Sequence, residues 1–282
     1  TGPSSIFVSG KYAYVANAGS NSISVLDISN PFAPIQIATT SMVSAPNSIF
    51  VSGKYAYVAL SGGTISVVDI SNPSAPTKIS AVTVGSFPYS IYILGRYAYV
   101  TNYDSGSGNT ISVVDISNPF APTQIATAVV GTGPQGIYVS GRYAYVANYG
   151  SNSMSVVDVS NPSAPIQVAT SSAGTWPQSI FVSGRYAYTA NYGSDNISVV
   201  DVSSSTAPVR ITNVSVGAGP SSVFVSGRYA YTANYNVGNG STISVVDISG
   251  TEVTSLIAHS AEVGNIQSRN DIFAQGNIMA GT

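Results

Sequence analysis

Apolar residues recur at every second position of this chain in short runs, which polar turn residues separate. Near the start of the chain these runs are residues 6–8, 12–16, 23–27 and 35–39. A period of two is typical of β-strands, and no helical period of 3.6 residues is present in the runs. The segments between them are Ser-Gly-Lys, an Asn-rich stretch and Asn-Pro-x-Ala-Pro, which all favour turns. The pattern therefore predicts a unit of four short antiparallel strands.

This four-strand unit occurs six times. Each copy contains the string Gly-[Lys/Arg]-Tyr-Ala-Tyr, which begins at Gly10, Gly53, Gly95, Gly141, Gly184 and Gly227. An aspartate ends the third strand of each copy, at Asp27, Asp69, Asp115, Asp158, Asp201 and Asp247. Each aspartate precedes the next glycine by 26 residues, so the variation in length lies in the loop between the second and third strands. Such regular units indicate a repeat architecture.

Four antiparallel strands in 42 to 46 residues are typical of a β-propeller blade. Apolar residues on both strand faces agree with blades that pack against two neighbours. We therefore expect an all-β fold, a six-bladed β-propeller of four-stranded antiparallel blades over residues 1–260, with the last fourth strand at residues 255–258. The first and last repeats lack the atypical sequence of solenoid caps, which favours a closed ring.

Residues 261–282 lack the repeat anchors and are expected to form a short C-terminal extension outside the propeller. One interpretation is a degenerate seventh hairpin, in which residues 272–276 replace Ile-Phe-Val-Ser-Gly. The other rests on Ile266, Ile272 and Ile278, whose spacing of six residues resembles the start of a β-helical or fibre stalk. The pattern breaks off at Thr282, so we expect a longer polypeptide.

The repeats also resemble known families. Tyr-Val-Ala-Asn-Tyr-Gly-Ser-Asn-Ser at residues 145–153, followed by Val-Val-Asp-Val-Ser-Asn-Pro at residues 156–162, is similar to the YVTN and LVIVD repeat families. The resemblance covers residues 1 to about 260. It implies a β-propeller of a bacterial or archaeal surface or secreted protein, and hence an extracellular or cell-surface location. It implies no single activity, because those families share none.

Charge is scarce and mostly repeated. Only 7% of the residues are charged and the net charge is −2, so no basic stripe is available for nucleic acid. No run of 18 apolar residues is present, so membrane insertion is not expected. Twelve of the 20 charged residues are repeated: six are the cations that follow the anchor glycines, and six are the anchor aspartates. We expect each cation to pair with its aspartate beside the first tyrosine of the second strand, in a structural role.

Few residues remain for chemistry. The charged residues outside the repeat anchors are Lys78, Asp104, Asp195, Arg210, Glu252, Glu262, Arg269 and Asp271. His259 is the only histidine and the chain has no cysteine, so a histidine–cysteine metal site is not expected. No Gly-x-Ser-x-Gly elbow is present. The loops with Asp104 and Asp195 hold one carboxylate each, which is a poor ligand set for Ca²⁺. The sequence thus predicts neither a catalytic group nor a metal or cofactor.

Differences between repeats point to one face of the ring. Because strands alternate in direction, the loops between second and third strands and the loops that lead into the next blade share a face, which we name the variable loop face. The loops that lead into the next blade carry aromatic and amide residues. Two of the loops between second and third strands have insertions, at residues 103–109 and 235–241. The predicted binding residues are Phe87, Tyr89, Trp176, Gln135, Gln178, Tyr103, Asp104, Asp195 and Tyr235.

Two functions follow from this pattern. Aromatic rings beside neutral polar groups suit a protein partner, self-association or a neutral glycan, although the same rings also suit packing over the central pore. The first hypothesis is a non-enzymatic extracellular interaction module, an adhesion head or a subunit of a surface filament or assembly. The alternative is a polysaccharide-acting enzyme, a glycosidase or lyase, in which Asp104 and Asp195 would supply the two carboxylates.

Overall fold

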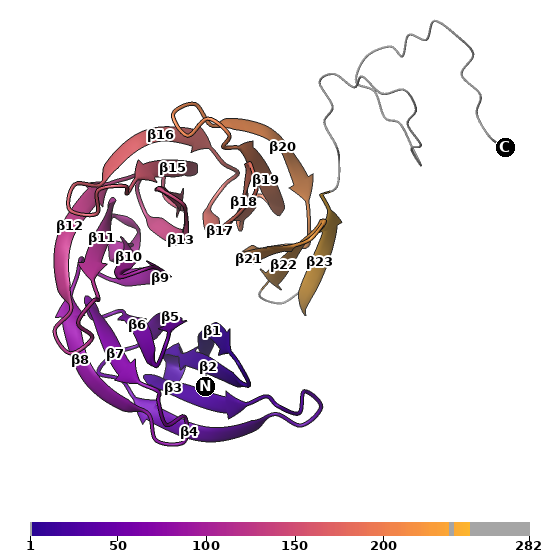
Figure 1. Cartoon of the computed structure of the whole chain (residues 1–282). Helices are drawn as coiled ribbons and strands as arrows, with labels where there is room; N and C mark the ends of the chain where they lie inside the picture. Colours follow the sequence, from indigo (N-terminus) through magenta and orange to yellow (C-terminus); the bar gives the residue numbers. More distant parts are fainter. Residues whose placement is uncertain (1, 237–239, 249–282) are drawn as a thin grey trace, which may run out of the picture. The chain divides into compact units, whose positions relative to one another are not determined.

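Six blades follow one another around a common axis in the computed structural model of the chain (Figure 1). The structure describes residues 2–236 and 240–248, which belong to one compact unit, Thr1–Ile248. The predicted strand at residues 255–258, His259 and the extension 261–282 lie outside the described residues. The prediction of an all-β, six-bladed propeller is confirmed.

Each blade is an antiparallel sheet in which the strands pair in chain order. The first three blades consist of β1 (Pro3–Ser9), β2 (Tyr12–Asn17), β3 (Ser22–Asp27), β4 (Ile35–Ser41); β5 (Pro46–Ser52), β6 (Tyr55–Leu60), β7 (Thr64–Asp69), β8 (Thr77–Thr83); and β9 (Pro88–Leu94), β10 (Tyr97–Asn102), β11 (Thr110–Asp115), β12 (Thr123–Val129). The other three consist of β13 (Pro134–Ser140), β14 (Tyr143–Asn148), β15 (Ser153–Asp158), β16 (Ile166–Ser172); β17 (Pro177–Ser183), β18 (Tyr186–Asn191), β19 (Asn196–Asp201), β20 (Val209–Ser215); and the described β21 (Pro220–Ser226), β22 (Tyr229–Asn236), β23 (Gly240–Asp247).

The anchor glycine of each repeat opens the tight turn between the first two strands. In blade 1, Ser9 pairs with Tyr12, which leaves Gly10 and Lys11 as a two-residue loop. Gly10 has a φ of 58°, and its equivalents in the other blades have φ values between 57° and 61°. A two-residue hairpin of type II′ needs glycine at its first position because that position has a positive φ. This requirement explains why glycine recurs in every copy.

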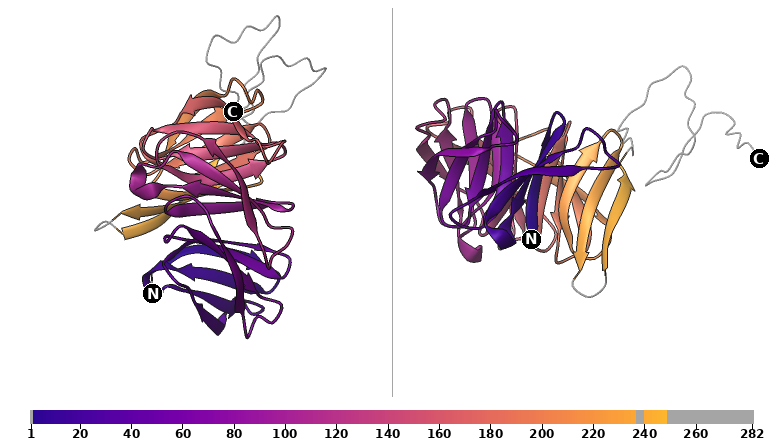
Figure 2. Two further views of the ribbon diagram at one scale, coloured as in Figure 1. Left: turned by 90° about the vertical axis from the view of Figure 1, so that its left-hand side faces the viewer. Right: turned by 90° about the horizontal axis from the view of Figure 1, so that it is seen from below.

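The hydrophobic core is divided among the boundaries between consecutive blades. Between blades 2 and 3, for example, Tyr57 and Val67 of blade 2 lie in one buried cluster with Ile91 and Val100 of blade 3. Equivalent clusters fill the other four boundaries from blade 1 to blade 6. Burial on both sides of a blade explains why its strands carry apolar residues on both faces. Figure 2 shows these blades from the side, with their strands running between the two ring faces.

Among the residues that the structure describes, the outward faces of the first and last blades are exposed. Ile6 of β1 is 62% exposed, whereas Ile49, its equivalent in blade 2, is 3% exposed. On blade 6, Ile243 and Val245 are also exposed, although their equivalents in blades 2 to 4 are buried. The closed ring expected from the sequence is therefore not formed by residues 2–236 and 240–248.

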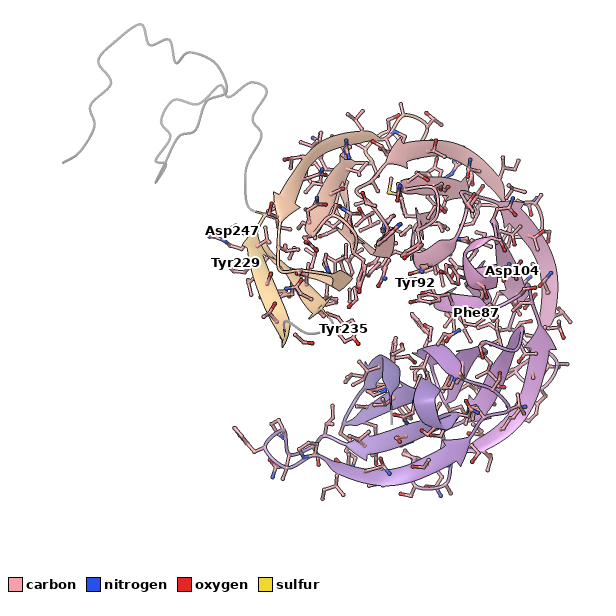
Figure 3. The ribbon with its side chains drawn as sticks, turned by 180° about the vertical axis from the view of Figure 1, so that it is seen from behind. Phe87, Tyr92, Asp104, Tyr229, Tyr235 and Asp247 are labelled. Atoms are coloured by element: carbon pink, nitrogen blue, oxygen red, sulfur yellow. The ribbon has the colours of Figure 1, made fainter. Side chains whose placement is uncertain are left out.

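An aromatic side chain from each innermost strand lines the central axis. These rings contact one another from blade to blade, with centroids between 4.6 and 5.3 Å apart, in the order Phe7, Phe50, Tyr92, Tyr138, Phe181 and Phe224. Tyr92 lies near the centre of the ring in Figure 3, and burial raises its pKa to about 12. The inner aromatic rings thus form a continuous packed row next to the axis.

Candidate binding site on the variable loop face

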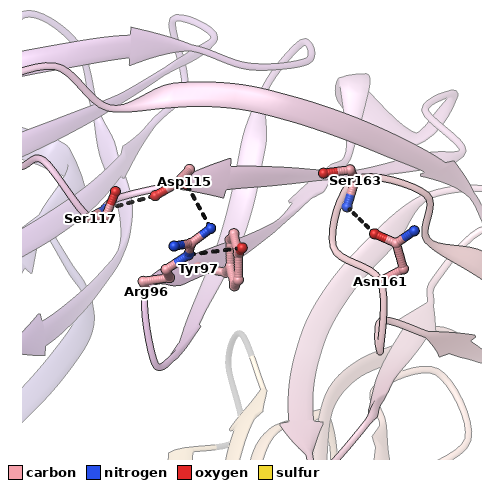
Figure 4. A network of polar contacts seen from close by, with 6 residues as sticks. All are labelled: Arg96, Tyr97, Asp115, Ser117, Asn161 and Ser163. Atoms are coloured by element: carbon pink, nitrogen blue, oxygen red, sulfur yellow. Dashed lines mark hydrogen bonds and ion pairs between the residues drawn. The ribbon is translucent and has the colours of Figure 1, made fainter.

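The charged residues of the repeats occupy the turns of the opposite face, where they stabilise each blade. In blade 3, Ser117 N donates to Asp115 Oδ1 over 2.9 Å, and Arg96 Nη2 lies 3.6 Å from Asp115 Oδ2 (Figure 4). Arg96 Nε also donates to the Tyr97 hydroxyl over 2.9 Å. The Asx-type turn and the ion pair satisfy the carboxylate locally. The structural role predicted for the anchor aspartates is confirmed.

The same arrangement repeats around the ring. Described cation–aspartate pairs are Lys11–Asp27, Arg96–Asp115, Arg142–Asp158, Arg185–Asp201 and Arg228–Asp247. The hydrogen bond from Arg142 lowers the pKa of Asp158 to about 2, and the one from Arg185 does the same for Asp201. These carboxylates are therefore ionised and engaged, and they support blade edges.

The variable loop face carries a tyrosine after the same asparagine of the repeat in four blades, directly after the second strand in blades 3 to 5 and within β22 in blade 6. These residues are Tyr103, Tyr149, Tyr192 and Tyr235. Blades 1 and 2 have Ala18 and Ser61 instead, so the tyrosines occupy one side of the face. The sequence prediction included Tyr103 and Tyr235 but missed Tyr149 and Tyr192. The signal was present, since each of the four follows the asparagine at the same position of the repeat, Asn102, Asn148, Asn191 or Asn234.

Ring contacts connect these tyrosines with the predicted aromatic residues. The centroid of Tyr103 lies 6.0 Å from that of Phe87, 5.4 Å from that of Tyr89 and 6.2 Å from that of Tyr149. Tyr149 in turn stacks on Trp176 with centroids 5.7 Å apart and 14° between the planes. We name Phe87, Tyr89, Tyr103, Tyr149 and Trp176 the aromatic band. It extends from blade 3 to blade 5, and Figure 3 labels Phe87 within it.

Two residues of the aromatic band have a strained backbone. Phe87 has a φ of 47° and Trp176 a φ of 55°, both in the left-handed region. At the same position Gly2, Gly133 and Gly219 have φ values of 64° to 66°. A side chain in this conformation costs about 1–2 kcal/mol, which glycine avoids. Backbone strain is often found at functional sites, so a large aromatic residue in place of glycine indicates that these two positions have a functional role.

The remaining predicted residues differ in how far they reach the surface. Tyr89 is largely covered by its neighbours, and this burial raises its pKa. Gln135 is buried, and its main-chain oxygen accepts a hydrogen bond from Thr101 Oγ1 over 2.7 Å. Gln178 is half-buried. Tyr89 and Gln135 therefore support the face from below, whereas Trp176, at 45% exposed, is one of its accessible rings.

The two insertions adopt different structures. In blade 3, Asp104 begins the short 3₁₀ turn η2 (Asp104–Gly106), and its carboxylate accepts a hydrogen bond from Ser107 Oγ over 3.3 Å. In blade 6 the insertion lengthens the hairpin, because Tyr235 pairs with Ser241 within β22 and β23. Tyr235, expected in a loop, thus stands on a strand and is 54% exposed. Figure 3 shows Asp104 and Tyr235 on their different blades.

A pocket of about 250 Å³ lies between blades 5 and 6 on this face. Its lining residues are Trp176, Tyr192, Gly193, Asp195, Ala218, Gly219 and Tyr235. Asp195 Oδ1 accepts a hydrogen bond from Gly219 N over 2.8 Å, which fixes the carboxylate at the pocket. The structure thus brings Trp176, Asp195 and Tyr235 together, as three of the predicted binding residues. Asp104 lies elsewhere, in the blade 3 loop.

Two further properties concern the described part of the chain as a whole. In it, no three His, Cys, Asp or Glu side chains gather closely enough to hold a metal ion. Nor does that part contain a helix of sufficient length and apolar character to cross a membrane.

The six repeats match one family in full. The LVIVD repeat profile matches residues 3–40, 45–84, 89–127, 134–171, 177–216 and 219–254. The chain belongs to the LVIVD repeat family. Six matches agree with the six blades, which confirms the resemblance to LVIVD repeats. No curated protein is significantly similar to this LVIVD repeat protein.

Solved structures share the architecture at low sequence identity. Hydrazine synthase of Kuenenia stuttgartiensis is 22% identical, with a TM-score of 0.72 over 87% of this chain and 83% of that chain. A protein from Lactobacillus plantarum is 18% identical, with a TM-score of 0.75 over 86% and 80% of the two chains. The periplasmic gluconolactonase of Pseudomonas aeruginosa is 22% identical, with a TM-score of 0.68 over 78% and 71%. These similarities extend to the fold alone.

Proposed function

We propose that this LVIVD repeat protein is a non-enzymatic interaction module of the cell exterior, an adhesion head or a subunit of a surface assembly. It binds a protein partner, another copy of itself or a neutral glycan through the variable loop face. The observation that carries this proposal is the aromatic band, in which Phe87 and Trp176 retain large side chains at the cost of backbone strain. A packing role alone would not require aromatic residues where other blades have glycine.

The distribution of charge supports the same face. The cations of the repeat turns lie over tyrosine rings on the opposite face, and five of them are paired with anchor aspartates. On the variable loop face, Asp104 and Asp195 are the acidic residues of the predicted site. Recognition there depends mainly on aromatic contact area, so we expect binding to persist in salt.

The test compares the two faces of the full chain. A glycan array and a mass measurement of the native assembly identify what the chain binds. A variant with Phe87→Ala, Trp176→Ala and Tyr235→Ala is expected to lose this binding, since it removes the half-buried ring of Phe87 and the exposed rings of Trp176 and Tyr235. Tyr89 is left intact. The control variants Lys54→Ala and Asp69→Asn alter the opposite face and are expected to bind normally; loss of binding only in these controls contradicts the proposal.

A hydrolase is the second candidate, because a gluconolactonase is among the similar structures. Hydrolysis of a polysaccharide by paired carboxylates would rely on Asp104 and Asp195. Each of these carboxylates accepts a hydrogen bond near its own loop, from Ser107 and Gly219 respectively. The test is turnover of soluble polysaccharides and of gluconolactone by the purified chain. Turnover that Asp195→Asn abolishes would establish the enzyme in place of the interaction module.

A further inference from the structure

The boundary between blades 5 and 6 repeats the boundary between blades 4 and 5 with one side chain missing. At the earlier boundary, Trp176 N donates to Asn152 Oδ1 over 2.8 Å. At the later one, Gly219 N donates to Asp195 Oδ1 over the same 2.8 Å. Trp176 and Gly219 also share a positive φ, of 55° and 64°. Gly219 is therefore the structural equivalent of Trp176, and Asp195 is the equivalent of Asn152.

This difference leaves Tyr192 without the indole that stacks on Tyr149, although both tyrosines are half-buried. The indole of Trp176 stacks on Tyr149 with 5.7 Å between centroids. At Gly219 an added Cβ would lie 2.1 Å from the main-chain oxygen of Tyr235 and 3.0 Å from Tyr192 Cε2, so the backbone of β22 stands close to where a side chain would begin. Gly219, Tyr192 and Tyr235 all line the pocket between blades 5 and 6, which has no equivalent of the indole.

The groups around the pocket favour positive charge. Three aromatic rings line it, those of Trp176, Tyr192 and Tyr235, and their faces carry negative potential. Asp195 adds a carboxylate, to which Gly219 N is the only donor within the described part of the chain. The uncharged Asn152 accepts the equivalent hydrogen bond at the earlier boundary. The hydrogen bond from Gly219 N therefore does not require the negative charge of Asp195.

The pocket also lacks a cation of its own. On the opposite face every blade places a lysine or arginine over a tyrosine ring, with 5.0 to 5.6 Å between the cation and the centroid. None of the residues that line the pocket is a lysine or arginine. Trp176, Tyr192 and Tyr235 are thus aromatic residues that line the pocket together with a carboxylate and with no cation among the lining residues.

We propose that the pocket between blades 5 and 6 binds an organic cation, an alkylammonium group that the partner of the variable loop face carries. This inference rests on the proposed interaction function and names the group that the site recognises. Aromatic faces attract a cation through their quadrupole, and rings that exclude water strengthen the attraction. Asp195 supplies the opposite charge at the pocket wall.

The fluorescence of Trp176 tests the proposal directly, because Trp176 is the only tryptophan of the chain. The probes are tetramethylammonium and methylammonium, with tert-butanol as a neutral molecule of similar shape and methyl glucoside as a neutral sugar. We expect a saturable fluorescence change with at least one ammonium probe and none with tert-butanol over the same concentrations. Tighter binding of tetramethylammonium indicates a quaternary or methylated ammonium, and tighter binding of methylammonium indicates a primary amine such as a lysine side chain.

Two variants separate the charge from the rings. Asp195→Asn keeps an oxygen that can accept the hydrogen bond from Gly219 N, as Asn152 does from Trp176 N, and removes the charge. The affinity for the ammonium probe is therefore expected to fall about fivefold. Tyr192→Leu removes one of the three lining rings and is expected to weaken binding about fivefold or more. Asp69→Asn makes the same chemical change on the opposite face and is expected to leave the affinity unchanged. Unaltered thermal unfolding shows that the variants are folded.

The outcomes distinguish this proposal from the proposed function. Saturation by methyl glucoside and not by either ammonium probe overturns the cation proposal while leaving an interaction module. An equal response to tert-butanol, or an Asp195→Asn variant that binds ammonium as tightly as the original chain, overturns it as well. Loss of the array or assembly partner in the Phe87, Trp176 and Tyr235 variant reports on the proposed function independently of the ammonium titration.

Discussion

The indole of Trp176 in blade 5 stacks on the ring of Tyr149 in blade 4, with 14° between their planes. This pair joins two blades at the variable loop face, although Trp176 holds a φ of 55° that glycine adopts more easily. Packing energy and backbone strain therefore act in opposite directions at the same residue. Their balance leads to the first prediction.

Trp176→Gly is expected to lower the free energy of unfolding by about 1–3 kcal/mol. The variant loses the buried half of the indole and an aromatic pair worth about 0.5–1.5 kcal/mol beyond its buried area, and it relieves a strain of about 1–2 kcal/mol. Binding through the variable loop face should nevertheless be lost. Urea unfolding and a binding assay on the same preparation measure the two effects. A loss of several kcal/mol would assign Trp176 to the structural core.

The anchor aspartates predict how stability depends on pH. Asp158 and Asp201 have a pKa of about 2 in the folded chain, below the ordinary value of 3.8. A carboxyl whose pKa is lowered by folding stabilises the folded state fully above its unfolded pKa, and this contribution is lost as the pH falls through the folded pKa. We expect the melting temperature to decline from about pH 4 to about pH 2.

The double variant Asp158→Asn, Asp201→Asn is the control for this decline. Asparagine accepts the turn hydrogen bond but does not titrate, so the variant should be less stable at pH 7 and lose less between pH 4 and pH 2. Thermal melts at a series of pH values give both quantities. Parallel curves for the variant and the original chain would show that other groups govern the acid response.

Aromatic residues inside the blade boundaries should matter more for stability than those on the variable loop face. Tyr14 is buried in the cluster between blades 1 and 2, so Tyr14→Ala is expected to cost roughly 3–5 kcal/mol. Tyr235 is exposed, and Tyr235→Ala should cost less than about 1 kcal/mol. Urea denaturation compares the two variants. Similar losses would mean that the exposed tyrosine has a packing role.

The sequence predicts the blade architecture because its anchors have a local cause. Gly10 and its equivalents are required by a positive φ in a two-residue turn, and Asp115 and its equivalents by a neighbouring turn amide and cation. Such requirements involve residues close together in the chain or in one hairpin. They recur in every copy and can be read by comparing the copies.

The candidate site is only partly predictable for the opposite reason. Tyr149 and Tyr192 recur in several copies, so they resemble repeat positions, and only packing across blade boundaries shows that one stacks on Trp176 and the other lines a pocket. The burial of Gln135 likewise depends on neighbouring blades. The amphipathic period of a strand says which side a residue faces but not what an adjacent blade places there.

Equivalent isoleucines of blades 1 and 2 differ in burial, since Ile6 is exposed and Ile49 is buried. Ile49→Ala removes a buried side chain between blades and is expected to cost about 2–4 kcal/mol. Ile6→Ala changes the same position of the repeat in blade 1, where the side chain is exposed. Its expected cost is therefore below about 0.5 kcal/mol. Because the two substitutions remove identical atoms from equivalent strands, their difference in urea unfolding measures burial alone. An equal cost would show that another part of the polypeptide or a second molecule covers the face of blade 1 in solution, and the exposed row of Ile6 and Val8 would then be a buried boundary.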